Sequence, residues 1–224
     1  MIPYKDDNPT SHFPFVTIAI ILINSIVFFL VPSSGEAGKE AVYAYGAIPI
    51  YIMSFQGAQP IHPFLTVFTS MFMHGSILHL LGNMLYLWIF GDNIEDRLGH
   101  VRFIIFYLIC GIVAAYSYAI TDPASKIPMI GASGAISGVL GAYLLLFPKA
   151  KVHALIFLGF FVTVIKIPAI LVIGFWAVIQ FLSGLLSTGL HAQGGIAWFA
   201  HVGGFLWGLI TIRLFMMRKR RYNW

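Results

Sequence analysis

The stretch IAWFAHVGGFLWGLITIRLF, residues Ile196–Phe215, decides how this chain folds. It is apolar over about the length that a helix needs to cross a bilayer, yet it carries His201 near its start. An ionisable side chain inside a membrane helix is costly and is by default a functional-site candidate. A second apolar stretch, Ser133–Phe147, begins with a serine. Ser133 and His201 together suggest a nucleophile and its base.

The composition of the whole chain is that of a membrane protein. Of its 224 residues, 59% are hydrophobic and 9% are charged, whereas a soluble domain carries about 25% charged residues. We predict an all-α membrane protein, a bundle of six transmembrane helices that span Phe13–Val31, Ser76–Phe90, Val101–Ile120, Ser133–Phe147, Ala169–Leu186 and Ile196–Phe215. The chain is expected to form one membrane domain over residues 1–224, with a short N-terminal tail (1–12) and a basic C-terminal tail (216–224).

Two connecting segments need separate interpretation. Ser33–Pro63 is a long first loop, and its Ile48–Ile52 part is expected to lie in the membrane interface. Val152–Ile165 is apolar but shorter than the roughly 20 residues that a span needs. If it crossed the bilayer, Ser133 and His201 would lie on opposite faces, so we interpret it as re-entrant or interfacial.

The distribution of lysine and arginine predicts the orientation. With the N-terminus inside, the inside segments hold Lys5, Arg97, Arg102, Lys149, Lys151 and the basic residues from Arg213 onward. The outside segments hold Lys39 and Lys126, and Lys166 is undecided. This asymmetry favours cytoplasmic termini, and the short N-terminal tail favours a prokaryotic inner membrane. The basic C-terminal cluster is typical of a membrane anchor, so no nucleic acid is expected as a partner.

Ser133 lies within Gly131–Gly134, where a helix is predicted to start. The first N–H groups of a helix have no intrahelical acceptor, so they can donate to a developing oxyanion. His79 and Asn83 lie four positions apart, hence on one helix face, and are further candidate oxyanion donors. The alternative is that they are polar contacts between helices. His74 falls off that face and is assigned to the loop or the helix start.

Small residues on two helices suggest how the serine and the histidine could meet. Two pairs have the Gly-x-x-x-Gly spacing, Gly134 with Gly138 and Gly204 with Gly208. Such pairs let helix backbones approach closely in lipid, as a direct Ser–His hydrogen bond requires. The alternatives are that the glycines and Ser133 only pack helices, and that His201 is a hydrogen-bonded core residue.

No carboxylate is placed by the sequence at the depth of Ser133 and His201. We therefore predict a dyad in which packing, and not an acid, holds His201. Glu95 and Arg97 lie in a predicted cytoplasmic turn and are interpreted as a structural charge cluster. The chain lacks a His-Glu-x-x-His pattern, so neither a metal nor another cofactor is expected.

In combination, these motifs resemble the rhomboid intramembrane serine proteases. The resemblance runs from Phe64 to Gly208 and rests on His74, His79-x-x-x-Asn83, Glu95-x-Arg97-Leu98-Gly99, Gly131-x-Ser133-Gly134 and Ala200-His201-x-x-Gly204-x-x-x-Gly208. It implies a six-helix bundle with a water-filled cavity open to the outer face. It implies Ser133 as nucleophile, His201 as general base and then acid, and His79, Asn83 and the Ser133 N–H as oxyanion donors. It also implies single-pass membrane proteins as substrates.

The chain departs from the family pattern at two places, and other functions stay open. Ser33–Pro63 lacks the Trp-Arg pair of some members, and Ser137 stands where some members pack a tyrosine against the histidine. One alternative is a noncatalytic rhomboid-like protein that binds membrane clients. Another is a small transporter, in which His79, Asn83 and His201 line a solute path. The sequence leaves the oligomeric state and the individual substrate open.

Overall fold

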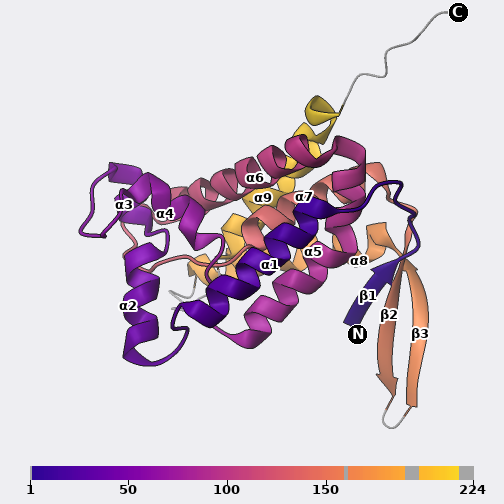
Figure 1. Cartoon of the computed structure of the whole chain (residues 1–224), viewed down its shortest axis with the longest axis horizontal. Helices are drawn as coiled ribbons and strands as arrows, with labels where there is room; N and C mark the ends of the chain where they lie inside the picture. The colour runs from indigo at the N-terminus through magenta and orange to yellow at the C-terminus, as the bar shows by residue number, and fades with distance from the viewer. Residues whose placement is uncertain (1, 159–160, 190–196, 217–224) are drawn as a thin grey trace, which may run out of the picture.

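The protein is a bundle of helices with a small β-sheet at one end (Figure 1). The computed structural model describes residues 2–158, 161–189 and 197–216. Its elements in chain order are β1 (Ile2–Asp6), α1 (Phe15–Leu30), α2 (Gly35–Tyr45), α3 (Pro49–Ser54), α4 (Pro63–Ser70), α5 (Ile77–Leu98), α6 (His100–Thr121), α7 (Ser133–Leu146), β2 (Lys151–Leu158), β3 (Phe161–Pro168), α8 (Ala169–Gly189) and α9 (Trp198–Phe215).

The helices agree with a multi-pass membrane protein. Within the described residues, α6, α8 and α9 are long and apolar enough to cross a membrane, and α1 and α7 are shorter apolar helices. Each predicted span contains one helix, although α5 continues past the expected end at Phe90 to Leu98. Ser76 caps α5 by accepting a hydrogen bond from the His79 N–H at 3.2 Å, so the predicted helix start there is confirmed. The number of crossings stays a prediction.

The sheet is a departure from the all-α prediction. Val152–Ile165, interpreted as re-entrant or interfacial, lies in an antiparallel hairpin of β2 and β3, and β1 pairs with the other edge of β2. These strands are rich in valine, isoleucine and phenylalanine, which favour extended backbone. The segment lacks apolar–polar alternation, so its periodicity did not identify strands. The predicted N-terminal tail contains β1, and the predicted C-terminal tail lies outside the described residues beyond Met216.

The first loop is packed onto the bundle at the end away from the sheet (Figure 1). It contains α2 and α3, and Ile48 and Ile52 are buried. Ala47 forms an antiparallel bridge with Met129, and the Gln59 side-chain amide donates to the Gly46 carbonyl at 2.9 Å. The bridge ties the loop to the segment that leads into α7, and the Gln59 bond holds two parts of the loop together. Its position relative to the membrane interface stays a prediction.

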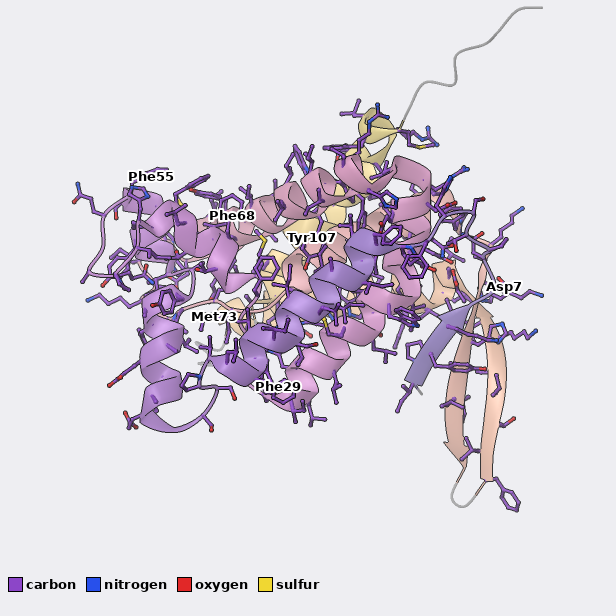
Figure 2. All side chains as sticks on the ribbon, viewed as in Figure 1. Asp7, Phe29, Phe55, Phe68, Met73 and Tyr107 are labelled. Atoms are coloured by element: carbon purple, nitrogen blue, oxygen red, sulfur yellow. The ribbon has the colours of Figure 1, made fainter. Side chains whose placement is uncertain are left out.

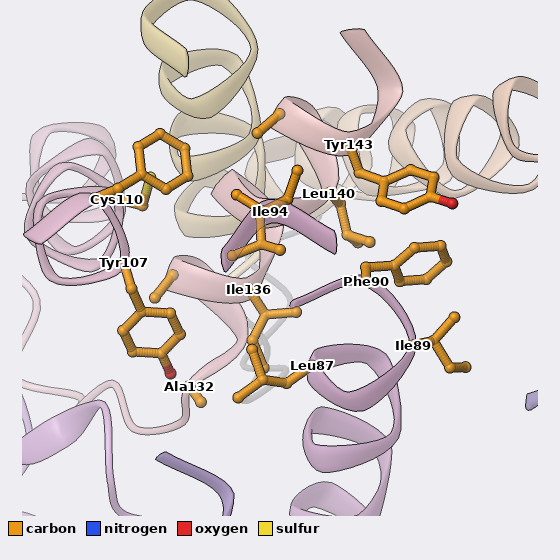
Figure 3. Packing of buried hydrophobic residues seen from close by; sticks show 14 of the residues in the cluster. Leu87, Ile89, Phe90, Ile94, Tyr107, Cys110, Ala132, Ile136, Leu140 and Tyr143 are labelled. Atoms are coloured by element: carbon orange, nitrogen blue, oxygen red, sulfur yellow. The ribbon is translucent and has the colours of Figure 1, made fainter. Parts of the chain in front are cut away.

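Helix α7 is the centre of the bundle. All of its residues from Gly134 to Tyr143 are buried, and neighbouring helices pack on several sides of it. Figure 3 shows Phe90 of α5 beside Leu140 and Tyr143, with Tyr107 of α6 on another side. Because α7 is rich in small residues, its neighbours can approach its backbone closely.

The closest of these approaches is the crossing of α7 with α9. A methyl group added at Gly204 would overlap the carbonyl oxygen of Gly134, and one added at Gly208 would overlap the carbonyl oxygen of Gly138. At Gly138 itself, an added methyl would meet the sulfur of Cys110 in α6. The glycine pairs identified in the sequence therefore lie in the contact between these two helices.

Glu95 joins the end of α5 to the start of α1. Its buried carboxylate accepts hydrogen bonds from the Val16 N–H at 2.9 Å and from the N–H and hydroxyl of Thr17 at 2.7 Å each. His100 Nδ1 lies 2.6 Å from the same carboxylate. Since α1 begins at Phe15, these N–H groups have no intrahelical acceptor, and a negative charge is favourable at a helix N-terminus. This geometry agrees with the structural role expected for Glu95.

Strand β1 is held to the bundle through α7. The carboxylate of Asp6 accepts a hydrogen bond from the hydroxyl of Tyr143, one turn before α7 ends. Burial raises the pKa of Asp6 to about 6. The carboxylate of Asp7, which Figure 2 labels beside the sheet, accepts from the Lys151 N–H at 2.7 Å. The sheet is therefore joined to the end of α7 that lies away from Ser133.

We predict that Gly208→Ala lowers the free energy of unfolding by about 1–3 kcal/mol, because the added methyl group forces α7 and α9 apart. Gly174→Ala in α8 is the matched control. Nothing lies within 4 Å of the position that its methyl group would occupy, so it should change stability by less than about 1 kcal/mol. Denaturant unfolding in detergent micelles measures both changes, and equal stability of the two variants would contradict the packing argument.

We also predict that Glu95→Ala lowers the free energy of unfolding by about 2–3 kcal/mol, because buried N–H groups of α1 lose a charged acceptor. Glu36→Ala is the control, since Glu36 is exposed and pairs only with the exposed Lys39 within the described residues. That change should stay within about 0.5 kcal/mol. A Glu95→Ala protein as stable as Glu36→Ala in the same unfolding assay would argue against the capping role.

Candidate active site

Ser133 and His201 meet at one end of the α7–α9 crossing. Ser133 is the first residue of α7, and His201 lies in the first turn of α9. Although the two residues are 68 positions apart in the sequence, the serine Oγ lies 2.7 Å from His201 Nε2. Both helices start at this end of the bundle, so the two side chains lie at the same level. This is the distance that a serine needs to pass its proton to a histidine.

Gln180 of α8 is the residue that the sequence reasoning missed. Its Oε1 lies 2.7 Å from His201 Nδ1, and its side chain is buried. The prediction that packing, and not an acid, holds His201 is therefore wrong about packing, because the amide oxygen of a glutamine accepts a hydrogen bond from the ring. A glutamine within the apolar stretch of α8 was the available signal, since a buried polar group needs a hydrogen-bond partner.

The Gln180 contact decides which nitrogen of His201 carries the proton. An amide oxygen can only accept a hydrogen bond, so Nδ1 of a neutral His201 is the donor. Nε2 is then the unprotonated nitrogen, and it accepts from the Ser133 hydroxyl. The ring is thus held in the tautomer that a general base requires.

Two tryptophans pack around the His201 ring. The ring of Trp176 lies 6.1 Å from it, tilted by 34°, and the ring of Trp198 lies 6.3 Å from it, nearly perpendicular. Ser137, which replaces the tyrosine of some family members, turns away and donates its hydroxyl to the Ser133 carbonyl at 2.6 Å. Two indole rings therefore lie beside the histidine.

His79 and Asn83 face the segment that leads into Ser133. An added Cβ at Gly131 would lie 2.8 Å from His79 Nε2 and 3.6 Å from Asn83 Nδ2. Gly131 has φ +117°, which an L residue with a side chain rarely adopts, and its N–H donates to the Ser70 carbonyl at 2.8 Å. Only a glycine here leaves room for both polar side chains close to the start of α7.

His74 lies in the turn before α5, as expected from the sequence, and it also joins the same polar group. Its Nε2 lies 2.9 Å from Asn83 Nδ2, and its ring centre lies 5.0 Å from that of His79. The turn between α4 and α5 brings it back onto the helix, which spacing along one helix does not reveal. The Asn83 amide has two hydrogens, so the bond to His74 orients the amide and leaves one hydrogen for another acceptor.

A cavity of about 750 Å³ connects these side chains. Its wall includes Ser133, His201, His79, Asn83 and Trp198. This volume lies within the range of about 300–1,000 Å³ that is common for ligand sites. The cavity therefore offers room for an extended peptide segment or several water molecules beside the Ser133 hydroxyl.

The arrangement has the parts needed for acyl transfer. Ser133 is hydrogen-bonded to a base, the base is oriented by Gln180, and the polar donors His79 and Asn83 line the same cavity. Because Ser133 is the first residue of α7, its own N–H has no intrahelical acceptor. A nucleophile, an oriented base and nearby oxyanion donors are the general signature of a serine hydrolase.

Comparison with known proteins points to one family. The Rhomboid domain matches residues 62–218 of this chain. This range includes α4 to α9 and therefore every residue of the site described above.

Curated relatives agree with the domain match. The chain is 31% identical over 141 residues to Rhomboid protease GluP of Bacillus subtilis, a match that covers 63% of this chain and 25% of that protein. It is 30% identical over 159 residues to RHOMBOID-like protein 1 of Arabidopsis thaliana, covering 71% of this chain and 36% of that protein. Rhomboid protein 1, mitochondrial, of Saccharomyces cerevisiae is 29% identical over 65% of this chain and 40% of that protein. The chain thus spans well under half the length of these relatives.

Proposed function

This chain is a member of the rhomboid family, and on that basis we propose that it is an intramembrane serine endopeptidase. The observation that carries the proposal is the hydrogen bond of 2.7 Å between Ser133 Oγ and His201 Nε2. The Rhomboid domain match, residues 62–218, contains both residues, and a relative named as a rhomboid protease is 31% identical over 63% of this chain. The alternative of a noncatalytic client-binding protein is a possible outcome of the tests below.

In the proposed reaction, Ser133 is the nucleophile and His201 the base. The serine Oγ attacks the carbonyl carbon of the scissile peptide bond while its proton moves to His201 Nε2. The protonated ring then gives this proton to the nitrogen of the leaving amine, and an acyl-enzyme remains. Water attacks the ester in the second half, and His201 again takes and returns a proton. Gln180 keeps Nδ1 as the donor in both halves.

The negative oxygen that forms during each attack needs hydrogen-bond donors. We assign this role to the Ser133 N–H, His79 and Asn83. Support comes from the shared cavity and from the short approach of His79 and Asn83 to Gly131, two positions before the serine. In soluble proteases, one such donor contributes about 3–4 kcal/mol to transition-state stabilisation.

The proposed substrates are single-pass membrane proteins. A peptide bond in a membrane helix is protected because its backbone groups are hydrogen-bonded within the helix, so the substrate must unwind locally before Ser133 can reach it. Hydrolysis also needs water, which favours a site near one membrane surface. The residues of the proposed machinery meet this need, because Ser133, His201 and His79 lie in the first turns of α7, α9 and α5.

We assign this end of the bundle to the outer face of a prokaryotic inner membrane, with six crossings and both termini inside. The charge distribution supports the orientation. Arg97 and Arg213 lie in the last turns of α5 and α9, and Lys149 follows α7. Lys166, which the sequence leaves undecided, pairs in the sheet with His153 at the same end. Positive residues favour the cytoplasmic side.

We predict that Ser133→Ala and His201→Ala each reduce cleavage of a single-pass substrate by at least about 1,000-fold, because each removes one half of the dyad. Purified protein in detergent or liposomes is incubated with a panel of single-pass substrates. Ser54→Ala, which changes the exposed last residue of α3, should cleave as the original protein does. Cleavage retained by Ser133→Ala would refute the proposal, and so would a failure of fluorophosphonate probes to label Ser133.

For Gln180 we predict that Gln180→Leu lowers kcat by about 10- to 100-fold with little change in KM, because His201 Nδ1 loses its acceptor. Gln180→Glu keeps an acceptor oxygen at the same place and should recover most of the rate. A role in packing alone predicts the reverse order, since leucine suits a buried apolar helix better than a charged side chain. Steady-state kinetics on the purified variants distinguishes the two roles.

A further inference from the structure

The sheet is the part of the structure that the proposed chemistry does not use. The β2–β3 hairpin follows α7 within a few residues and leads directly into α8 at Ala169. It therefore lies at the end of α7 opposite Ser133. Figures 1 and 2 show that most of the hairpin stands away from the helices, with only its base close to them.

One row across the base of the sheet is basic. Lys5 of β1 pairs with His153 of β2, and His153 pairs with Lys166 of β3. Like charges directly opposite each other destabilise a sheet, and both lysines are exposed. The ion pairs found within the described residues involve neither of them. An external anion would relieve this repulsion.

His153 lies between the two lysines of this row. Burial, together with the charges of Lys166 and Lys5, lowers its pKa, and Asp7 opposes this effect only in part. The buried His153 Nε2 has no hydrogen-bond partner within the described part of the chain. Asp6 and Asp92 line a pocket with Lys5, but within the described residues neither lysine of the row forms an ion pair.

The next row outward on the same face is apolar, formed by Ile2, Leu155 and Val164. From Ala154 to Ile165 the sequence has no charged residue. Side chains of β3 in this outer half are exposed, with Phe161 at 79%, Val162 at 57% and Val164 at 47%. An exposed apolar surface beside a charged row indicates a site that contacts a membrane or another molecule.

The path of the N-terminal segment shows which way the outer half points. Asn8 bonds to Asn93, and the Ser11 and His12 N–H groups donate to Asp96 at 3.0 and 2.9 Å. Residues 8–12 therefore run along α5 toward its polar C-terminal end. Followed backward from Asn8 to Ile2, strand β1 leads away from this polar end of α5 (Figure 1).

Lys5 and Trp88 line a common pocket of about 270 Å³, together with Asp92. Trp88 lies one turn before Asp92, where α5 changes from apolar to polar, and tryptophan is typical of the membrane boundary. The basic row consequently lies near the level of that boundary, and the outer half of the hairpin lies on its membrane side.

We propose that the outer half of the β2–β3 hairpin lies in the interfacial layer of the lipid leaflet at the end of the bundle opposite Ser133, with Lys5 and Lys166 on phosphates of anionic headgroups. In this layer, headgroups and water can still bond to the free edge of β3. Val162 lies four positions before Lys166, which is about 13 Å along a strand. A strand tilted toward the membrane plane therefore stays within the headgroup layer and the upper acyl chains. The exposed apolar surface also continues from β3 into Ile170 and Leu171 of α8. This inference goes beyond the proposed protease activity and does not depend on it.

A second copy of this chain is the competing occupant, through pairing at the free edge of β3. Edge pairing satisfies backbone N–H and C=O groups but leaves the faces of the strands in water. The exposed side chains of Val162 and Val164 and the unpaired lysines are on those faces. A lipid leaflet covers both the apolar rows and the basic row, so the observations favour lipid.

The test uses an environment-sensitive fluorophore on single cysteines in the full-length protein in nanodiscs. Labels are placed at Val162→Cys and Val164→Cys in β3 and at Lys149→Cys, an exposed position before β2. The native Cys110 is buried, so the original protein measures background labelling. Lipids that carry a nitroxide quencher on the acyl chain should reduce the fluorescence at position 162 by at least about twofold, less at 164 and little at 149, as this placement predicts.

Charge recognition is tested in the same protein. Quenching at Val162→Cys should be stronger in nanodiscs that contain phosphatidylglycerol than in phosphatidylcholine alone, and the added changes Lys5→Gln and Lys166→Gln should remove this difference. Equal quenching at 149 and 162 would overturn the proposal. A second outcome would also overturn the proposal. In liposomes, energy transfer between labelled copies would rise with the protein-to-lipid ratio while the lipid quencher had no effect. That result would assign the surface to a second copy of the chain.

Discussion

The close crossing of α7 and α9 is the contact on which the rest of the structure depends. In lipid, helices gain little from burying apolar side chains, and close backbone packing holds them together instead. At Gly204 and Gly208 there is no room even for a methyl group beside the carbonyl oxygens of α7. Because this contact is backbone against backbone, it sets the separation of the helix axes almost rigidly. The hydrogen bond between Ser133 and His201 at the end of the crossing follows from that separation.

A membrane interior also requires that polar groups find partners, and this requirement organises the site. His201 lies between the Ser133 hydroxyl and the Gln180 amide, so both ring nitrogens are used. Asn83 bonds to Nε2 of His74, whereas the buried Nδ1 of His74 has no partner within the described residues. Each partner satisfies a buried group and at the same time orients it. The neutral glutamine orients the histidine without adding a buried charge, which would be costly at this depth.

The two ends of the bundle differ in how they are held. At the end opposite the dyad, Glu95 fastens α1 to α5, and the contact of Asp6 with Tyr143 fastens the sheet to α7. At the dyad end the helices surround a cavity of about 750 Å³. A firmly connected end allows the other end to stay open without loss of the fold, since few contacts cross the cavity. The lipid contact proposed for the hairpin would add to the firm end.

The sequence by itself determined the membrane class, the approximate helices, and the serine, histidine and glycine positions, because hydropathy and i, i+4 spacing are local properties of a chain. Only the tertiary structure decided that Gln180 and His74 join the site, because each comes from an element whose rotation and neighbours are set by packing. Only the structure showed a sheet where an apolar segment suggested a re-entrant loop, since strand pairing joins residues such as Lys5 and His153 that are far apart in the sequence. Local patterns reveal which residues share a helix face, whereas contacts between elements depend on how whole surfaces fit together.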